Sequence, residues 1–440
     1  MATASLLGNA AATAIAAATK LSPKEMSQRL FGGRKYVLAP MVRCGTLPMR
    51  LTCLKYGADT VFGPEIIDRK LMRCYREVNP RLGTVDIRMF TKDGGKGGVL
   101  VFRTKPSLER GRLVFQLGSS TPETAVAGAQ LIADDVDGID LNMGCPKDFS
   151  IKGGMGAALL KTPDIACEIV KALRTNFPNK CVSCKIRLLD TKEETIRLCQ
   201  RLEAAGAHAI SVHARTREER PRDPAHWDDL IPLVKCVSIP VLANGDIFSR
   251  QDAEECFRRT GVESVLVARG ALLNPTMFDP SGKRLPIEDV CRDIIRFCIE
   301  TDHHPVNCKY ILQYMFKENG ILGTERGRSL TSKKCRDLPT MAALFGLTAE
   351  DTGNFETVTV HSREHDIEKA KLAEKLRLAT AKAEMTADDE LPEKYSDDFH
   401  LTHGSDIPRD RVQKKKTPDS SRDPLIEVGE GPPPSKKSKQ

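Results

Sequence analysis

The sequence predicts a (β/α)8 barrel, followed by a small all-α region and a charged tail. Three observations support this fold class. From residue 34 onward, short β-rich runs alternate with amphipathic helical patterns, as in a parallel sheet. Eight such runs precede residue 280, which matches the roughly 250 residues that a closed eight-stranded barrel usually takes. A polar residue stands at or just after nearly every run, where such barrels hold their ligands.

The elements of the barrel follow one another in order along the chain. The candidate strands are 35–39, 59–62, 113–116, 138–142, 182–187, 209–213, 240–243 and 264–268. Helical stretches able to cover the outside of the barrel are 121–134, 163–174, 193–205 and 250–259. One segment interrupts this alternation, since residues 91–111 contain the run Gly94-Gly95-Lys96-Gly97-Gly98. We expect that segment to be a mobile insertion near the mouth of the barrel.

Helical patterns replace the alternation after residue 280. The stretches 287–301, 307–318 and 332–345 predict a small bundle packed on the barrel. Beyond residue 351 the chain is charged and has few apolar residues, so we expect a largely disordered basic tail, with a short helix near 367–380. Residues 1–33 are expected to form a flexible N-terminal extension. The predicted divisions are therefore 1–33, 34–284, 285–350 and 351–440.

The composition limits the classes of protein that the chain can belong to. Its 440 residues carry a formal net charge of +8, which permits a polyanionic partner without requiring one. The Ala-rich N-terminal stretch has no Arg before Arg29, unlike a mitochondrial presequence, and it is too short and interrupted to span a bilayer.

The 14 cysteines show no disulfide framework, so we expect reduced thiols inside the cell. Cys181 and Cys184 should face opposite sides of a strand, and we expect no metal site.

Residues at the carboxyl ends of the candidate strands predict the site. They are Pro40, Met41, Val42, Glu65, Gln116, Asn142, Cys145, Lys185, His213, Asn244, Gly245, Asp246, Ala268, Arg269 and Gly270. Lys185 and His213 alternate with apolar residues and should point into the barrel. The loops after the seventh and eighth strands, with Asn244 to Asp246 and Ala268 to Gly270, are the usual phosphate-binding position of this fold. By themselves they would equally suit a barrel that binds a sugar phosphate.

The most specific passage is 138–147, Gly-Ile-Asp-Leu-Asn-Met-Gly-Cys-Pro-Lys, followed by Lys152-Gly153-Gly154-Met155-Gly156. It holds one thiol, Cys145, beyond the end of the fourth strand and adds glycines that let backbone approach a ligand. This passage closely resembles the signature of the dihydrouridine synthases, flavoenzymes that reduce uridine in tRNA. The resemblance extends over residues 37–347 and is strongest to the eukaryotic branch acting on uridine 20 of the D-loop.

The resemblance implies an enzyme that binds FMN and uses NADPH transiently to reduce it. Cys145 would donate a proton to the uracil ring, and an ordinary thiol is mostly protonated at neutral pH. Pro40, Met41 and Val42 would lie against the flavin. Gln116 can both donate to and accept from the flavin's pyrimidine edge, and Lys185 could stabilise negative charge on the ring. Glu65, His213 and the two phosphate-binding loops complete the expected cofactor site.

The implied partner is tRNA, whose target base must leave its stack to reach the barrel. Candidate RNA contacts are Asn142, Lys147, Lys152, Arg215, Arg217 and Lys309. Residues 351–440 lack the pattern of the double-stranded-RNA-binding domain that animal members often carry, so we expect the basic tail to supply non-specific phosphate contacts.

Two other functions stay open from the sequence alone. One is a flavin barrel acting on a free pyrimidine or another small molecule, and the other is a non-catalytic tRNA-binding protein. We expect a monomer without a membrane segment, in the cytoplasm, with the nucleus or mitochondrion as alternatives.

Overall fold

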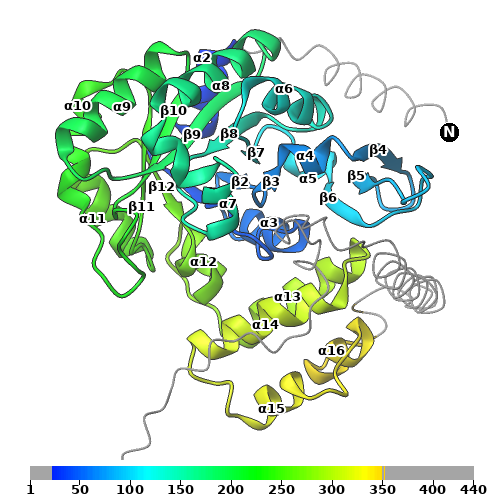
Figure 1. The fold of residues 1–440 in the computed structure, drawn as a ribbon. Helices are drawn as coiled ribbons and strands as arrows, with labels where there is room; N and C mark the ends of the chain where they lie inside the picture. Colours follow the sequence, from blue (N-terminus) through cyan, green and yellow to red (C-terminus); the bar gives the residue numbers. More distant parts are fainter. Residues whose placement is uncertain (1–21, 349–350, 352–440) are drawn as a thin grey trace, which may run out of the picture. The chain divides into compact units, whose positions relative to one another are not determined.

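The computed structural model describes residues 22–348 and 351, and its centre is a closed barrel of parallel strands surrounded by helices (Figure 1). All of the expected strands are confirmed, and their ends differ from the prediction by no more than two residues. They are β1 (Lys35–Leu38), β2 (Thr60–Phe62), β7 (Leu113–Gly118), β8 (Gly138–Asn142), β9 (Cys181–Arg187), β10 (Ala209–His213), β11 (Val241–Asn244) and β12 (Ser264–Val267). Parallel pairing of β2 with β7 closes the barrel.

Helices cover the outside of the barrel as predicted. They include α3 (Leu47–Lys55), α6 (Pro122–Gln130), α8 (Pro163–Asn176), α9 (Lys192–Ala204), α10 (Ile231–Cys236) and α11 (Arg250–Thr260). Their starts follow from local sequence, since the side chains of Thr121, Thr191 and Ser249 accept backbone N–H groups at the beginning of α6, α9 and α11. Gly261, with φ of 75°, ends α11 in the left-handed conformation that glycine adopts easily.

The amino ends of the strands are closed by helix α2 (Pro23–Phe31), which the sequence analysis did not predict. Leu30 and Phe31 are fully buried in the barrel interior, and the Thr60 hydroxyl donates to the Leu30 carbonyl at 2.8 Å. The flexible extension expected over 1–33 is therefore wrong for residues 23–31. The missed signal is the capping box of Ser22 and Glu25, which starts a helix. Residues 1–21 lie outside the described residues.

The two cysteines of β9 point to opposite faces, as expected from their spacing. Cys181 packs inside the barrel with Val37 and Leu242, whereas Cys184 belongs to the core between strands and outer helices. Within the described residues, no group of three or more Cys, His, Asp or Glu could hold a metal ion.

The insertion before β7 contains an antiparallel sheet, which corrects the expectation of a loop over 91–111 for residues 100–109, whereas residues 91–99 do lie in a loop. Its strands are β4 (Cys74–Asn79), β5 (Thr84–Met89) and β6 (Leu100–Thr104), preceded by α4 (Asp68–Leu71) and followed by α5 (Pro106–Glu109). Phe102 and Glu109 are buried, and the Glu109 carboxylate accepts from the buried guanidinium of Arg50 at 2.6 Å. Arg50 and Glu109 are both buried, which their pairing makes possible.

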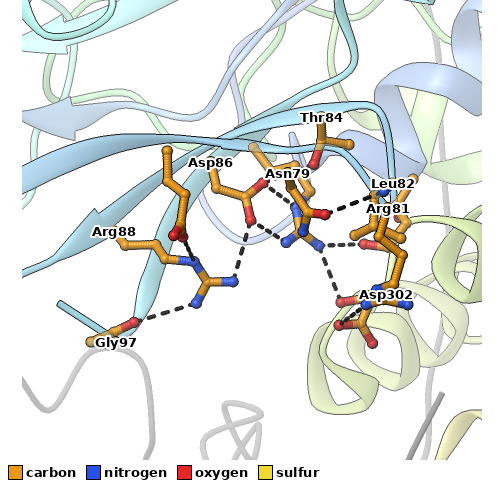
Figure 2. A network of polar contacts seen from close by, with 12 residues as sticks. Asn79, Arg81, Leu82, Thr84, Asp86, Arg88, Gly97 and Asp302 are labelled. Carbon is orange, nitrogen blue, oxygen red and sulfur yellow. Dashed lines mark hydrogen bonds and ion pairs between the residues drawn. The ribbon is translucent and has the colours of Figure 1, made fainter.

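A polar network joins this sheet to the helical region (Figure 2). Arg103 donates to Asp86 and also to the backbone carbonyl of Thr301. Arg81 pairs with Asp302 at 3.4 Å, next to Thr301 in the turn before α14 (Pro305–Glu318). The inserted sheet is therefore tied to both the barrel and the helices that follow it.

The expected helical region is confirmed, with one correction. It consists of α13 (Ile287–Glu300), α14, α15 (Glu325–Thr331) and α16 (Leu338–Leu344), and α13 packs on α3 of the barrel (Figure 1). The single helix expected over 332–345 is wrong, because α16 starts only at Leu338. Asp337 caps that helix by accepting from Thr340, and Pro339 occupies its first turn, where proline is tolerated.

Within the described residues, no helix combines the length and the apolar character that crossing a bilayer requires. The chain divides into the units Met1–Asp389 and Glu390–Gln440, and every described residue lies in the first. The expected basic tail, except Asp351, and the short helix near 367–380 lie outside the described residues.

Candidate active site

The carboxyl ends of the barrel strands bring the predicted polar residues together at one rim. Strand register places Asn142 of β8 beside Lys185 of β9, and His213 of β10 beside Asn244 of β11. Gln116 of β7 stands next to Asp140 of β8. Residues far apart in the sequence therefore line one continuous surface at the mouth.

Asp140 is a buried carboxylate of this surface that the sequence analysis missed. It accepts from Gln116 Nε2 at 2.9 Å and from Ser183 Oγ at 2.7 Å. Burial raises the pKa of Asp140 to about 6, against the opposing effects of these two hydrogen bonds. Gln116 uses one of its two amide N–H groups for Asp140, so its second N–H and its amide oxygen remain available to a ligand. The signal was present in the sequence, since residue 140 shares the inward face of the strand with Asn142.

Lys185 carries its ammonium into the barrel. Burial, reinforced by the Arg187 guanidinium, lowers the pKa of Lys185 to about 8. The ammonium donates no hydrogen bond to a described residue, although Asp140 lies near enough to attract it. A cation held in this way is suited to an anionic ligand or to charge that develops during a reaction.

The thiol loop is held by backbone contacts at the end of β8. Asn142 Oδ1 accepts the backbone N–H groups of Gly144 at 2.9 Å and Cys145 at 3.1 Å. The Cys145 carbonyl accepts from Ala157 at 3.0 Å. Gly156, with φ of 56°, is required because a Cβ there would lie 2.7 Å from the Cys145 carbonyl oxygen. These contacts fix the backbone from which the Cys145 side chain projects.

The Cys145 thiol is half-buried and stays protonated at neutral pH. Burial raises its pKa, and the negative charge of Glu65 raises it further, whereas the Lys147 backbone N–H and Ser150 lower it. Ser150 Oγ is buried and has no other partner within hydrogen-bonding geometry in the described residues. The thiol can therefore serve as a proton donor.

Glu65 lies between β2 and the short strand β3 (Ile66–Ile67), with its carboxylate toward the thiol loop. The side chains of Asn142 and Cys145 lie next to this carboxylate and lower its pKa. Burial raises the pKa of Glu65 to about 7 despite these two contacts. The structure thus places Glu65 with the thiol, apart from the residues of the phosphate-binding loops.

A basic pocket lies at the ends of β9 to β12. It is lined by Arg187, His213, Arg215, Glu219, Arg220, Asn244, Gly245, Asp246, Ala268 and Arg269, among others. Gly245 has a φ of 121°, and a Cβ there would stand 3.3 Å from both His213 and Arg215. A Cβ on Gly270 would lie 2.4 Å from the Ile247 carbonyl oxygen, so glycine is needed there as well. The sequence analysis missed Arg187, which is the next inward residue after Lys185 on β9.

Asp246 orients two arginines of this pocket. Its carboxylate accepts from Arg215 at 2.5 Å and from Arg269 at 2.8 Å, and also from the backbone N–H of Ala225. A carboxylate repels a phosphate, so the predicted contribution of Asp246 to an anion site acts through the arginines that it holds.

His213 is neutral in this surrounding. Burial and the neighbouring cations, led by Lys185, hold its pKa far below the usual value. Arg215 Nη1 lies 3.2 Å from His213 Nε2. Because a guanidinium can only donate, Nε2 accepts this bond and the ring proton sits on Nδ1.

The structure separates the predicted RNA contacts into two groups. Lys147, just before helix α7 (Asp148–Lys152), and Lys152, the last residue of that helix, are exposed beside the thiol loop. Arg217 is partly exposed. Arg215 is buried against Asp246, contrary to our expectation of an RNA contact. Lys309 Nζ donates to the carbonyls of Ser332 and Cys335, both at 2.8 Å, which is a structural role.

The β1–α3 loop completes the rim with Pro40, Met41 and Val42. Met41 packs partly against the core, whereas the Val42 side chain is exposed. Arg43 follows with a φ of 68° and lies 5.1 Å above the ring of Tyr310 from α14. The loop thus connects the barrel mouth to the helical region.

Comparison with known proteins places these features in a family. Residues 37–306 match the family described as "Dihydrouridine synthase (Dus)". The chain is 42% identical over 294 residues to the tRNA-dihydrouridine(20) synthase [NAD(P)+] of Saccharomyces cerevisiae, covering 63% of this chain and 76% of that protein. It is also 42% identical over 298 residues to the protein of the same name from Schizosaccharomyces pombe, covering 65% of this chain and 61% of that protein. A human tRNA-dihydrouridine(20a/20b) synthase [NAD(P)+]-like protein is 34% identical to this chain over 268 residues, covering 60% of this chain and 77% of the human protein.

Proposed function

Since this chain belongs to the dihydrouridine synthase family, we propose that it reduces a uridine in the D-loop of tRNA to 5,6-dihydrouridine, with NADPH as reductant. The observation that carries this proposal is the protonated, half-buried thiol of Cys145. The thiol stands at the mouth of the barrel on the loop that follows β8, beside the strand that carries Lys185. A protein that only binds tRNA needs no proton donor in this position. In this proposal residues 34–284 form the catalytic domain and residues 285–350 a tRNA-binding domain.

The residues of the rim fit a flavin mononucleotide. Arg187, Arg215, Arg220 and Arg269 line one pocket and outnumber its two carboxylates, Glu219 and Asp246, which suits a phosphate dianion. Ser211 Oγ, inside the barrel next to Lys185 in register, is buried without a hydrogen-bond partner in the described residues. Such a buried polar atom is normally satisfied by a ligand or water. The amide oxygen of Gln116 and the backbone of Pro40 to Val42 would face the ring.

The proposed chemistry divides between the cofactor and this chain. When bound, FMN would supply the hydride for carbon six of the uracil ring. Cys145 would deliver the proton to carbon five, and its raised pKa keeps that proton in place until it is needed. Lys185 would stabilise negative charge near the ring.

Access to the uracil ring requires that the nucleotide leave its stack, because the thiol lies at the mouth of the barrel. Lys147, Lys152 and Arg217 would contact phosphates around the opening. We propose that the protein acts as a monomer in the cytoplasm.

The test is dihydrouridine formation, measured by mass spectrometry of nucleosides after incubation of the protein with unmodified tRNA and NADPH. We expect product from the native protein and little from Cys145→Ala. Turnover of a free pyrimidine without RNA would support a small-molecule oxidoreductase instead. Binding of tRNA without any product would support the non-catalytic alternative.

A further inference from the structure

We propose that Glu65 returns a proton to Cys145 after each turnover, an inference that rests on the function proposed above. The Glu65 carboxylate lies close enough to the thiol for its negative charge to raise the pKa of Cys145, yet the reduction of uridine as described gives it no task. A thiol that donates its proton is left as a thiolate, and it must be protonated again before the next substrate is reduced. Glu65 is a positioning residue in this scheme, because it acts through the thiol.

Strand pairing fixes the Glu65 carboxylate at the thiol loop. The residues that follow it, Ile66 and Ile67 of β3, pair with Leu117 and Gly118 at the end of β7. A Cβ on Gly118 would lie 2.7 Å from Glu65 Oε1, so glycine leaves the space that the carboxylate occupies. The backbone of two strands therefore holds Glu65 against Asn142 and Cys145.

Few groups near the thiol could supply a proton at neutral pH. Cys145 is faced by Glu65, by the Ser150 hydroxyl and by the Lys147 backbone and side chain. The Ser150 hydroxyl is too weak an acid, and the Lys147 side chain is exposed to water. Lys185 and Arg187 act on Cys145 only through their charges. Among these groups, Glu65 is the acid that is placed to protonate the sulfur.

The surroundings of Glu65 favour transfer in the required direction. Glu65 is faced by Asn142, Cys145 and, at longer range, Asp140, whose charge disfavours a second carboxylate. Burial raises the pKa of Glu65 to about 7, so a large fraction is protonated near neutral pH. The pKa of Cys145 is raised above its ordinary value, so a proton passes from the carboxyl to the thiolate downhill.

The two steps balance in protons and electrons. In the first step, the S–H bond of Cys145 breaks as a C–H bond forms at carbon five, and the electron pair stays on sulfur. In the second step, the O–H bond of Glu65 breaks, the S–H bond forms again, and the carboxylate later takes a proton from water. Neither step transfers electrons, because both electrons of the reduction arrive with the hydride and come from NADPH.

The kinetic test separates the first turnover from later ones. With the protein in excess over tRNA and its cofactor reduced beforehand, Glu65→Gln should give product at close to the native rate, because the thiol is already protonated. With tRNA in excess, kcat should fall by about tenfold to a hundredfold, and its dependence on pH should change. Glu123→Gln, which removes an exposed carboxylate on α6, is the matched control and should behave as the native protein.

A second variant moves the carboxylate without removing it. Gly118→Ala keeps a permitted backbone conformation but forces Glu65 Oε1 away, since this atom is at the end of a flexible side chain. It should slow repeated turnover as Glu65→Gln does. This variant also keeps the test decisive if the amide of Glu65→Gln disturbs the loop.

A chemical readout needs neither tRNA nor reductant. The rate at which iodoacetamide alkylates Cys145, followed by the mass of its peptide, reports the thiolate fraction at each pH. Because the charge of Glu65 raises the thiol's pKa, the profile should move to lower pH in both Glu65→Gln and Gly118→Ala, and stay unchanged in Glu123→Gln.

The outcomes distinguish the inference from the function on which it rests. Normal repeated turnover in Glu65→Gln, or a first turnover as slow as the later ones, would show that Glu65 does not return the proton to Cys145. The activity of the native protein would be unaffected by that result. An unchanged alkylation profile would overturn the contact itself. A native protein that forms no dihydrouridine, yet shows the alkylation shift, would overturn the proposed function and leave the Glu65–Cys145 pair in place.

Discussion

Arg103 of β6 and Asp86 of β5 form a buried ion pair, and the same guanidinium donates to the Thr301 carbonyl at the end of α13. The two side chains are almost completely shielded from water, with exposures of 4% and 0%. This pair joins the inserted sheet to the helical region, which follows it by about two hundred residues (Figure 2). A buried charge is costly unless it is paired, so both partners are needed.

Arg103→Met should destabilise the protein by about 3–5 kcal/mol, because it leaves the Asp86 carboxylate buried without its main partner. Urea unfolding followed by circular dichroism would measure the loss. Arg258→Met is the matched control, since its pair with Glu255 is largely exposed and should contribute about 0–1 kcal/mol. Equal effects of the two variants would contradict the role of the buried pair.

The barrel could be predicted from sequence because its signals are local. Each strand is a short apolar run. Because side chains alternate between the two faces of a strand, the run from 182 to 187 placed Lys185 inside the barrel before any contact in space was known. The inserted sheet could not be predicted in this way. Charged residues of the insertion, such as Arg103 in the sheet and Glu109 in the helix after it, look solvated until partners distant in the sequence are known.

The same limit applies to the candidate site. Position at a strand end was enough to select Cys145, Lys185 and His213, which the structure brings to one rim. The orientation of Arg215 and Lys309 was not predictable, because it depends on Asp246 and on carbonyls that only the folded chain brings near. Charge alone suggested RNA contacts where the fold uses these two side chains internally.

His208 should make the protein less stable as the pH falls from about 6.5 to 4. Burial, aided by Arg174, lowers its pKa to about 4, and its Nδ1 accepts the Val182 N–H at 2.9 Å only while the ring is neutral. The pKa of His208 is lower in the folded protein than in the unfolded chain. The neutral ring therefore stabilises the fold fully above pH 6.5, and this contribution is lost as the pH falls toward 4, because the unfolded chain takes up a proton more readily. Urea midpoints at pH 7 and pH 5 should differ more in the native protein than in His208→Gln. An equal pH dependence in both would show that other groups cause it.

Arg269→Ala should weaken the binding of flavin mononucleotide by about tenfold to a hundredfold, since a charged hydrogen bond contributes about 1.5–3 kcal/mol. The loss should be smaller for riboflavin, which lacks the phosphate, so the two ligands together locate the effect. Quenching of flavin fluorescence on titration with the protein stripped of cofactor measures both affinities. Arg258→Ala, far more exposed on α11, should change neither. An equal loss for riboflavin and the mononucleotide would place Arg269 away from the phosphate.

Lys147 and Lys152 should contribute to tRNA affinity through phosphate contacts, whereas Lys309 should act on stability. Each of Lys147→Ala and Lys152→Ala should reduce the slope of log affinity against log salt concentration by about one, with little change in unfolding. Lys171→Ala changes an exposed lysine on the outer helix α8 and should leave the slope unchanged.

Lys309→Met should lower the urea midpoint, because the Lys309 ammonium bridges the carbonyls of Ser332 and Cys335 after α15. If Lys309→Met instead reduces the salt slope and leaves the midpoint unchanged, this ammonium reaches RNA and the bridge is dispensable.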